Sequence, residues 1–342
     1  MAAIAPWQLK AGKLRRREFI SLTGGFLASL PSPSRAQSPN NRMSRIAYLG
    51  ATSPSALDPR QLEQFKRGLV DNGLIEGHNI TIDYFWAEGR LDRLRSLADE
   101  LALHDFDVII TAGGQAVHAL MAASVKTPIV FAILGDPVGD GVVESLAHPG
   151  KNLTGLSMAN SHLESKRLEL LKQAYVPLKR VLVLHDPSAS SSAAVVADVQ
   201  SGARALGIES MVFEASDPAR FDAIFVEAVD QGANGVAAMA SSVLNFHHRH
   251  LCELAIQHRL PSIWEASGYV RDGGLLSYGP NFPDMYRQAA GYIAKILNGT
   301  KASDLPIEQP VRFEFAINLK TANALGLALP TTLITRADEV IE

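Results

Sequence analysis

The sequence is poor in cysteine and has no excess of basic residues, and these two shortages exclude whole classes of protein. Cys252 is the one cysteine among 342 residues, so the chain can form neither an internal disulfide nor a zinc site built from several cysteines. Lysine and arginine total 32 against 35 aspartate and glutamate residues, for a formal net charge of −3. Because nucleic-acid-binding proteins usually carry a strong positive excess, we expect no nucleic-acid partner.

Signatures of catalysis are equally scarce. The chain contains no Gly-x-Gly-x-x-Gly after a strand and no P-loop, and the segment nearest to a nucleophile elbow, Gly155–Ala159, lacks the second glycine. His247, His248 and His250 lie close in sequence, but a metal site needs three or four converging ligands and only two of the three share a helical face. The sequence therefore predicts a protein that is not an enzyme and has no metal and no cofactor.

The composition is that of a globular protein, with 47% hydrophobic and 20% charged residues. A length of 342 residues is enough for two domains of ordinary size, each with a core of its own.

The first 43 residues differ from the rest. Arg15, Arg16 and Arg17 precede a short apolar run, Phe19–Leu30, which is too short to span a bilayer because spanning takes about 20 residues. Prolines and small residues up to Ala36 follow, and this three-part order is typical of an export signal peptide.

The segment Arg16-Arg17-Glu18-Phe19-Ile20 resembles the twin-arginine export motif, because Phe19 and Ile20 follow the arginine pair at the spacing of that motif. We expect residues 1–36 to be a signal peptide and residues 37–43 a flexible linker, which places the mature protein in the periplasm. The alternative is an ordinary disordered basic terminus.

Short apolar runs of β type alternate with helical patterns from Arg45 onward, which is typical of parallel sheets covered by helices. The expected strands are Arg45–Gly50, Asn79–Phe85, Asp107–Thr111, Pro128–Ile133, Arg180–His185, Ile208–Glu214, Gly235–Ala240 and Pro261–Trp264. The predicted fold class is α/β, with two doubly wound Rossmann-like lobes joined by a hinge. We expect residues 44–157 plus 274–342 to form lobe 1 and residues 158–273 to form lobe 2, with a ligand between them at the carboxyl ends of the strands.

Several segments resemble, in the same order, those of one family. They are Ala87–Arg90, Gly135–Val138, Lys166–Leu171, Gly273–Gly279, Tyr286–Ala290, Asp304–Pro310 and Ile317–Ala322. The resemblance covers residues 44–342 and is to substrate-binding proteins of ABC transporters related to the tryptophan-binding TrpX group, which have the type I periplasmic binding-protein fold.

This resemblance implies a monomeric, periplasmic solute-binding component of an ABC importer. Its partners would be a small-molecule solute and an inner-membrane permease with its ATPase. The alternative is a periplasmic ligand sensor on the same fold, which presents its bound molecule to a receptor.

Candidate binding residues follow the expected strand ends of the first lobe. Residues Thr111 to Gln115 form the best anion cradle, because glycines let a ligand approach the backbone at the start of a helix. Asp136 precedes a proline and is either a turn residue or the partner of a ligand ammonium group. The predicted site residues here are Ser53, Thr111, Gly113, Gly114, Gly135, Asp136 and, on the returning tail, Tyr278.

The second lobe offers equivalent strand ends, with candidates Asp186, Ser241, Trp264 and Glu265. Relatives often carry Asn where this chain has Asp186, so the ligand's charge preference is expected to differ. Trp264 either stacks on an apolar ligand or packs in the core. Together these residues predict a carboxylate-bearing solute, namely an amino acid with an apolar or aromatic side chain, or an aromatic acid.

Overall fold

The computed structural model describes residues 42–158, 163–189 and 192–342. The predicted signal peptide, its cleavage site and most of the predicted linker lie outside the described residues. Within the described part of the chain, no helix combines the length and the hydropathy that crossing a membrane requires.

The first lobe is built on a five-stranded parallel sheet in the order β2-β1-β3-β4-β5. Its strands are β1 (Ser44–Gly50), β2 (Ile80–Trp86), β3 (Val108–Thr111), β4 (Ile129–Leu134) and β5 (Leu153–Ser157). Side chains alternate along each strand, so β1 sends Ile46 and Tyr48 to one face and Ala47 and Leu49 to the other. The first face is covered by α1 (Pro59–Asp71) and α10 (Phe282–Leu297), the second by α2 (Leu91–Leu103) and α3 (Gly114–Ala122).

The second lobe has a seven-stranded sheet in the order β12-β11-β10-β9-β8-β6-β7. Its strands are β6 (Arg180–His185), β7 (Glu209–Glu214), β8 (Val236–Ala238), β9 (Ser262–Trp264), β10 (Leu276–Pro280), β11 (Phe313–Asn318) and β12 (Glu339–Ile341). Only the β10–β11 pair is antiparallel among these described strands.

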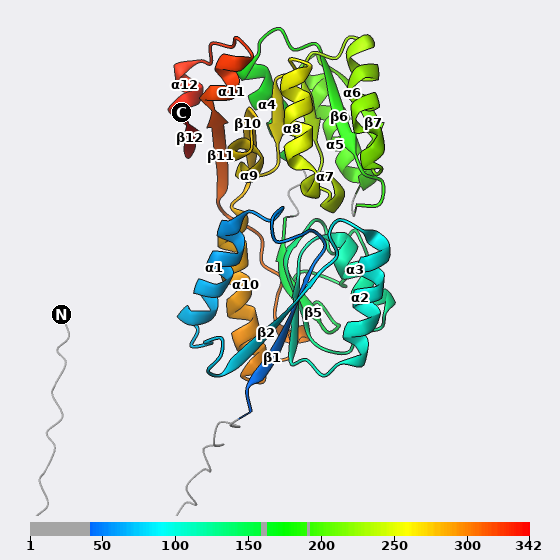
Figure 1. The fold of residues 1–342 in the computed structure, drawn as a ribbon, viewed down its shortest axis with the longest axis vertical. Helices are drawn as coiled ribbons and strands as arrows, with labels where there is room; N and C mark the ends of the chain where they lie inside the picture. The colour runs from blue at the N-terminus through cyan, green and yellow to red at the C-terminus, as the bar shows by residue number, and fades with distance from the viewer. Residues whose placement is uncertain (1–41, 159–162, 190–191) are drawn as a thin grey trace, which may run out of the picture. The chain divides into compact units, whose positions relative to one another are not determined.

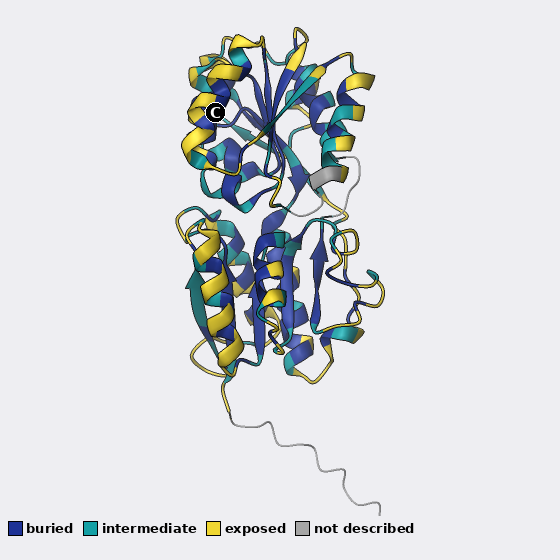
Figure 2. Ribbon diagram, turned by 90° about the vertical axis from the view of Figure 1, so that its right-hand side faces the viewer, coloured by how far each residue is buried: buried dark blue, intermediate teal, exposed yellow. Residues whose placement is uncertain are grey.

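Helices cover both faces of this second sheet. One face carries α4 (Leu163–Ala174) and α5 (Ser192–Ala205), and the other carries α6 (Phe221–Asp230) and α8 (His248–Gln257). The shorter helices are α7 (Ser242–Phe246), α9 (Ser267–Arg271), α11 (Leu319–Ala324) and α12 (Thr331–Ile334), with 3₁₀ turns at Pro218–Arg220 and Ala302–Asp304. In each lobe the central strands are buried, the edge strands β2, β7 and β12 are only partly buried, and the outer faces of the helices are exposed (Figure 2).

The prediction of two α/β lobes with parallel sheets is confirmed, but the assignment of residues 274–342 to lobe 1 is wrong for the strands of that segment. β10 pairs in parallel with β9, and β11 and β12 extend the same sheet, so all three belong to the second lobe. Only α10 and the stretch up to Glu308, which bridges to Leu156, lie on the first lobe. The chain therefore passes between the lobes three times: between β5 and α4, between β10 and α10, and before β11 (Figure 1).

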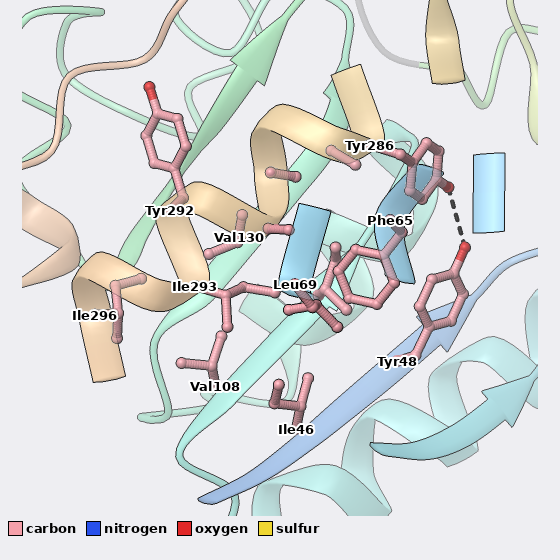
Figure 3. Close-up of a cluster of buried hydrophobic side chains, with 14 of the residues drawn as sticks. Ile46, Tyr48, Phe65, Leu69, Val108, Val130, Tyr286, Tyr292, Ile293 and Ile296 are labelled. Carbon is pink, nitrogen blue, oxygen red and sulfur yellow. Dashed lines mark hydrogen bonds between the residues drawn. The ribbon is translucent and has the colours of Figure 1, made fainter. Parts of the chain in front are cut away.

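The helix pair α1 and α10 holds the returning chain to the first lobe. Phe65 and Leu69 of α1 pack with Tyr286 and Ile293 of α10 above the β1–β3 strands (Figure 3). A side chain at Gly68 would place its Cβ 2.5 Å from the carbonyl oxygen of Arg287, so a glycine is needed where the two helices approach each other.

We predict opposite effects for two glycine-to-alanine substitutions in this helix pair. Gly68→Ala should destabilise the protein by about 1–3 kcal/mol, because the new methyl group overpacks the contact with α10. Gly291→Ala, where the nearest atom is 4.0 Å away, should stabilise it by up to about 1 kcal/mol through helix propensity. Denaturant unfolding of both variants measures this, and equal effects of the two would contradict the packing described.

Candidate functional site

A cavity of about 440 Å³ lies between the lobes, at the carboxyl ends of the strands. From the first lobe it is lined by residues following β1, β3 and β4, and from the second by residues following β6, β8 and β9. The order of the first sheet reverses between β1 and β3, and ligands of open α/β sheets bind at such a switch point. Its size is that of ordinary small-molecule sites.

Seven of the predicted site residues line this cavity. They are Gly113, Gly114, Gly135, Asp136, Asp186, Ser241 and Glu265. Some of these residues belong to the first lobe and the others to the second, so the structure brings together strand ends that are up to about 150 residues apart in sequence.

Four predicted site residues do not line the cavity. The Ser53 hydroxyl is within hydrogen-bond distance of Ser55 and serves the loop after β1, while its neighbour Thr52 lines the cavity. Thr111 is buried, and its hydroxyl donates a hydrogen bond to the carbonyl oxygen of Leu49 (2.8 Å). Both residues shape the strand ends rather than the cavity surface.

The two predicted aromatic walls are also placed elsewhere. Trp264 is fully buried, stacks on Tyr269 with ring centroids 5.1 Å apart, and donates its indole N–H to Ser262, which is the core-packing alternative. Tyr278 stacks on Phe313 and does not line the cavity, and its carbonyl oxygen accepts a hydrogen bond from Arg167, which does.

The aromatic wall that the cavity does possess comes from the first lobe. Trp86 is the last residue of β2, and Tyr48 lies two residues before the end of the neighbouring β1. Their ring centroids are 5.0 Å apart, and Phe282 and Tyr286 of α10 line the cavity with them. The hydroxyl groups of Tyr48 and Tyr286 are 3.1 Å apart (Figure 3). Burial raises the pKa of Tyr286 to about 12 and that of Tyr48 well above its ordinary value, so both rings stay neutral.

The N-terminus of α3 opens on the cavity. Gly113 caps this helix with a φ of +85°, a conformation that favours glycine. A Cβ at Gly113 would lie 3.0 Å from the hydroxyl of Ser242, so the two lobes approach each other closely here. The first-turn N–H groups of a helix have no partner within the helix, which makes this end a suitable place for a carboxylate.

Asp186 is a bridge between the lobes. Its carboxylate accepts hydrogen bonds from the hydroxyls of Ser188 and Ser241 in the second lobe and from the Gln115 amide of the first lobe (3.3 Å). The same amide donates to Ser188 (2.7 Å). Asp186 therefore has its acceptor sites filled by protein donors, while Gln115 Oε1 is buried with no hydrogen-bond partner among the described residues.

Asp136 is partly used by its own turn. Its Oδ1 accepts the backbone N–H groups of Val138 (3.2 Å) and Gly139 (2.9 Å), the pattern of an Asx turn. The turn alternative of the sequence analysis is therefore present, with the carboxylate still at the cavity surface.

A group of charged side chains lies under the second lobe's wall of the cavity. Arg167 is almost fully buried, forms an ion pair with Glu164 and donates its Nε–H to the carbonyl oxygen of Tyr278 (2.7 Å). Glu265 lines the same cavity, and burial raises its pKa to about 7, although the Arg167 guanidinium acts in the opposite direction.

A second ionic group joins the lobes beside the hinge. Arg271 of α9 pairs with Asp58, which caps α1, and with Glu339 of β12, while Arg60 pairs with Asp58 and donates to Ser267. It borders a second cavity of about 280 Å³. Among the described residues, no three His, Cys, Asp or Glu side chains are arranged to hold a metal, and His248 instead pairs with Asp272 (2.6 Å).

Sequence reasoning missed Tyr48, Trp86, Glu164 and Arg167 as cavity residues, and it included Gln115 only as the end of the cradle that begins at Thr111. The available signals were positional, since Trp86 ends a strand and Gln115 directly follows the Gly113-Gly114 pair. Nothing local in the sequence marks Tyr48 or Arg167, which reach the cavity through tertiary packing.

We predict a pH-dependent stability difference for Glu265→Gln. The folded state holds the Glu265 proton up to about pH 7 against an ordinary pKa of 4.5, so this carboxyl favours folding fully at low pH and progressively less as the pH rises towards 7. Glutamine cannot ionise, so the variant should gain in unfolding free energy relative to wild type between pH 4.5 and pH 8, by about 3 kcal/mol at most.

Denaturant unfolding across this pH range measures the difference. Glu63→Gln, at an exposed position of α1, is the matched control and should parallel wild type. Parallel curves for Glu265→Gln and wild type would contradict a buried, neutral carboxyl.

Comparison with known proteins agrees with this architecture. The chain is 24% identical over 266 residues to a tyrosine-binding protein of Clostridioides difficile, which covers 77% of this chain and 75% of that protein. A conserved domain protein of Vibrio cholerae has 25% identity and a TM-score of 0.81, covering 87% of this chain and all of that one. An ABC domain of Streptococcus pneumonia in complex with L-Trp has 22% identity and a TM-score of 0.80, with 88% and 100% coverage, and so shares the fold.

The match to a family model also spans most of the chain. Residues 53–341 match the family described as ABC transporter substrate binding protein. The chain belongs to the family of ABC transporter substrate-binding proteins, with the type I periplasmic binding-protein fold.

Proposed function

We propose that this protein captures an α-amino acid with an apolar or aromatic side chain in the periplasm and delivers it to the inner-membrane permease of an ABC importer. The observation that carries the proposal is the interlobe cavity, which sets a helix N-terminus beside an aromatic wall. A carboxylate is stabilised at the former and an apolar side chain at the latter. The names of its relatives, a tyrosine-binding protein and a protein bound to L-Trp, support this ligand class.

In this proposal, capture works by a shift between open and closed forms. The cavity is lined from both lobes, so a ligand that touches both favours the closed form by its differential affinity. Three chain crossings allow the lobes to move as units, and the Gln115 bridge to Asp186 and Ser188 is made only when the lobes approach.

We predict that calorimetry will detect binding of L-tryptophan or L-tyrosine to the protein. L-Tryptophanamide, which lacks the carboxylate, should bind the protein about tenfold more weakly or worse, since a partly buried charge at a helix N-terminus contributes up to about 2 kcal/mol. Small-angle scattering should show a smaller radius of gyration at saturating amino acid.

The matched variants are Trp86→Leu and Tyr278→Leu, because both rings are half-buried but only Trp86 lines the cavity. Trp86→Leu should weaken binding and Tyr278→Leu should not. Binding of a neutral sugar with no response to any amino acid would refute the proposed ligand class.

Export by the twin-arginine route is a further part of the proposal. Replacing Arg16 and Arg17 together by lysine keeps the charge but removes the paired motif, so it should abolish most of the periplasmic protein. Arg15→Lys, just outside the pair, is the control and should leave export unchanged. Immunoblots of periplasmic and cytoplasmic fractions measure this, and full export of the double variant would exclude the route.

A further inference from the structure

Glu265, in the wall of the cavity, has a buried acceptor atom that is not satisfied by any described residue. It follows β9, its residue is only 7% exposed, and it lines the cavity wall. Its Oε2 is buried with no hydrogen-bond partner among the described residues. A buried carboxylate oxygen without a donor is costly, so it indicates a site that a bound molecule completes.

The charges around Glu265 favour a cation at this carboxylate. Arg167 is the positive group that acts on the Glu265 carboxyl, but its guanidinium already forms an ion pair with Glu164 and donates to the Tyr278 carbonyl. The three side chains therefore sum to one negative charge when Glu265 is ionised and to zero when it is protonated. A ligand cation that fills the cavity compensates the ionised form.

The other cavity carboxylates are less suited to this role. Asp186 accepts from Ser188, Ser241 and Gln115, and Asp136 Oδ1 accepts two backbone N–H groups of its own turn. Asp198 of α5, which also lines the cavity, accepts on both carboxylate oxygens from Ser165. The sequence alone offered Asp136 either as a turn residue or as the partner of a ligand ammonium group, whereas these contacts favour Glu265 as that partner.

We infer that Glu265 receives the ammonium group of the captured amino acid, and that binding displaces a proton from the Glu265 carboxyl to the solvent. The protonated carboxyl gives up its O–H proton to buffer, and the resulting carboxylate accepts hydrogen bonds from the ligand –NH₃⁺, which keeps its own protons. This inference rests on the proposed function, since it requires a ligand with an amino group.

Proton displacement makes the affinity depend on pH. Glu265 has a pKa of about 7, so it is mostly protonated at pH 6 and mostly ionised at pH 8. Binding should therefore release close to one proton at pH 6 and few at pH 8, and the affinity should rise about tenfold between them. Other titratable groups also face Glu265 or line the cavity with it. They are Glu164 and Arg167 of α4, Asp198 of α5, Tyr269 of α9, His185 and Asp186 after β6, Asp136 after β4, and Tyr48 and Tyr286 of the first lobe.

Titration calorimetry of the full protein tests the inference, with L-tryptophan and L-tyrosine as probes at pH 6 and pH 8. Buffers of different ionisation enthalpy count the protons released. Indole-3-propanoate, which differs from tryptophan by lacking the amine, is the ligand control and should release none. Glu265→Gln should lose both the proton release and the tenfold rise, whereas Glu265→Asp should retain proton release. Thermal unfolding of each variant checks that it is folded.

The outcomes separate this inference from the function on which it rests. If wild type binds an amino acid but Glu265→Gln keeps the same proton release and pH dependence, the titrating group is another one, and the inference is overturned. It is equally overturned if Asp136→Asn abolishes amino-acid binding while Glu265→Gln binds like wild type. If wild type binds none of the amino acids, the proposed function itself falls, and the inference with it.

Discussion

Parallel strands bring all their carboxyl ends to one edge of a sheet, and the site of this protein depends on that constraint. In each lobe the strands that reach the cavity run in the same direction, so the loops after β1, β3 and β4 meet the loops after β6, β8 and β9. In the first lobe these loops begin with a small residue, Ala51, Ala112 or Gly135, which leaves space for a ligand at the edge of the sheet. A ligand cavity between the lobes follows from the direction of the strands before any particular side chain is considered.

The chain returns from the second lobe to the first, and the returning segment links the two sheets and lines the cavity between them. After β10 the chain leaves the second sheet, lays α10 against α1 and β1, and returns at β11. Because α10 carries Phe282 and Tyr286, the same helix that ties the lobes together also supplies half of the aromatic wall. Ligand contact and hinge geometry are therefore coupled through one element.

Hydrogen-bond saturation divides the polar residues of the cavity into two groups. Asp186 is buried and accepts from three side chains, so its role in the structure is to join Gln115 to the second lobe. Glu265 and Gln115 Oε1 instead keep an acceptor without a partner among the described residues. Saturated groups set the shape of a site, and unsatisfied ones define the chemistry of what it receives.

The sequence predicted the architecture and about half of the site because both follow from local patterns. Alternating strands and helices identify the two lobes, and strand ends followed by small polar residues located Gly113, Asp136, Asp186 and Glu265. The strands of residues 274–342 were assigned to the wrong lobe because their sequence pattern fits a strand of either sheet. Only the pairing of β10 with β9 shows which sheet they belong to.

Aromatic residues were the least predictable part for a related reason. Trp264 is the last residue of β9, and neighbouring residues of a strand point to opposite faces of the sheet. Which face Trp264 takes is decided by tertiary packing, and it packs in the core of the second lobe. Tyr48 and Tyr286 are 238 residues apart and meet only because α10 packs on β1. The contacts that fold the first lobe therefore also position the aromatic wall. Substitutions of the polar cavity residues on the loops should disturb the fold less than substitutions of the aromatic residues in the wall.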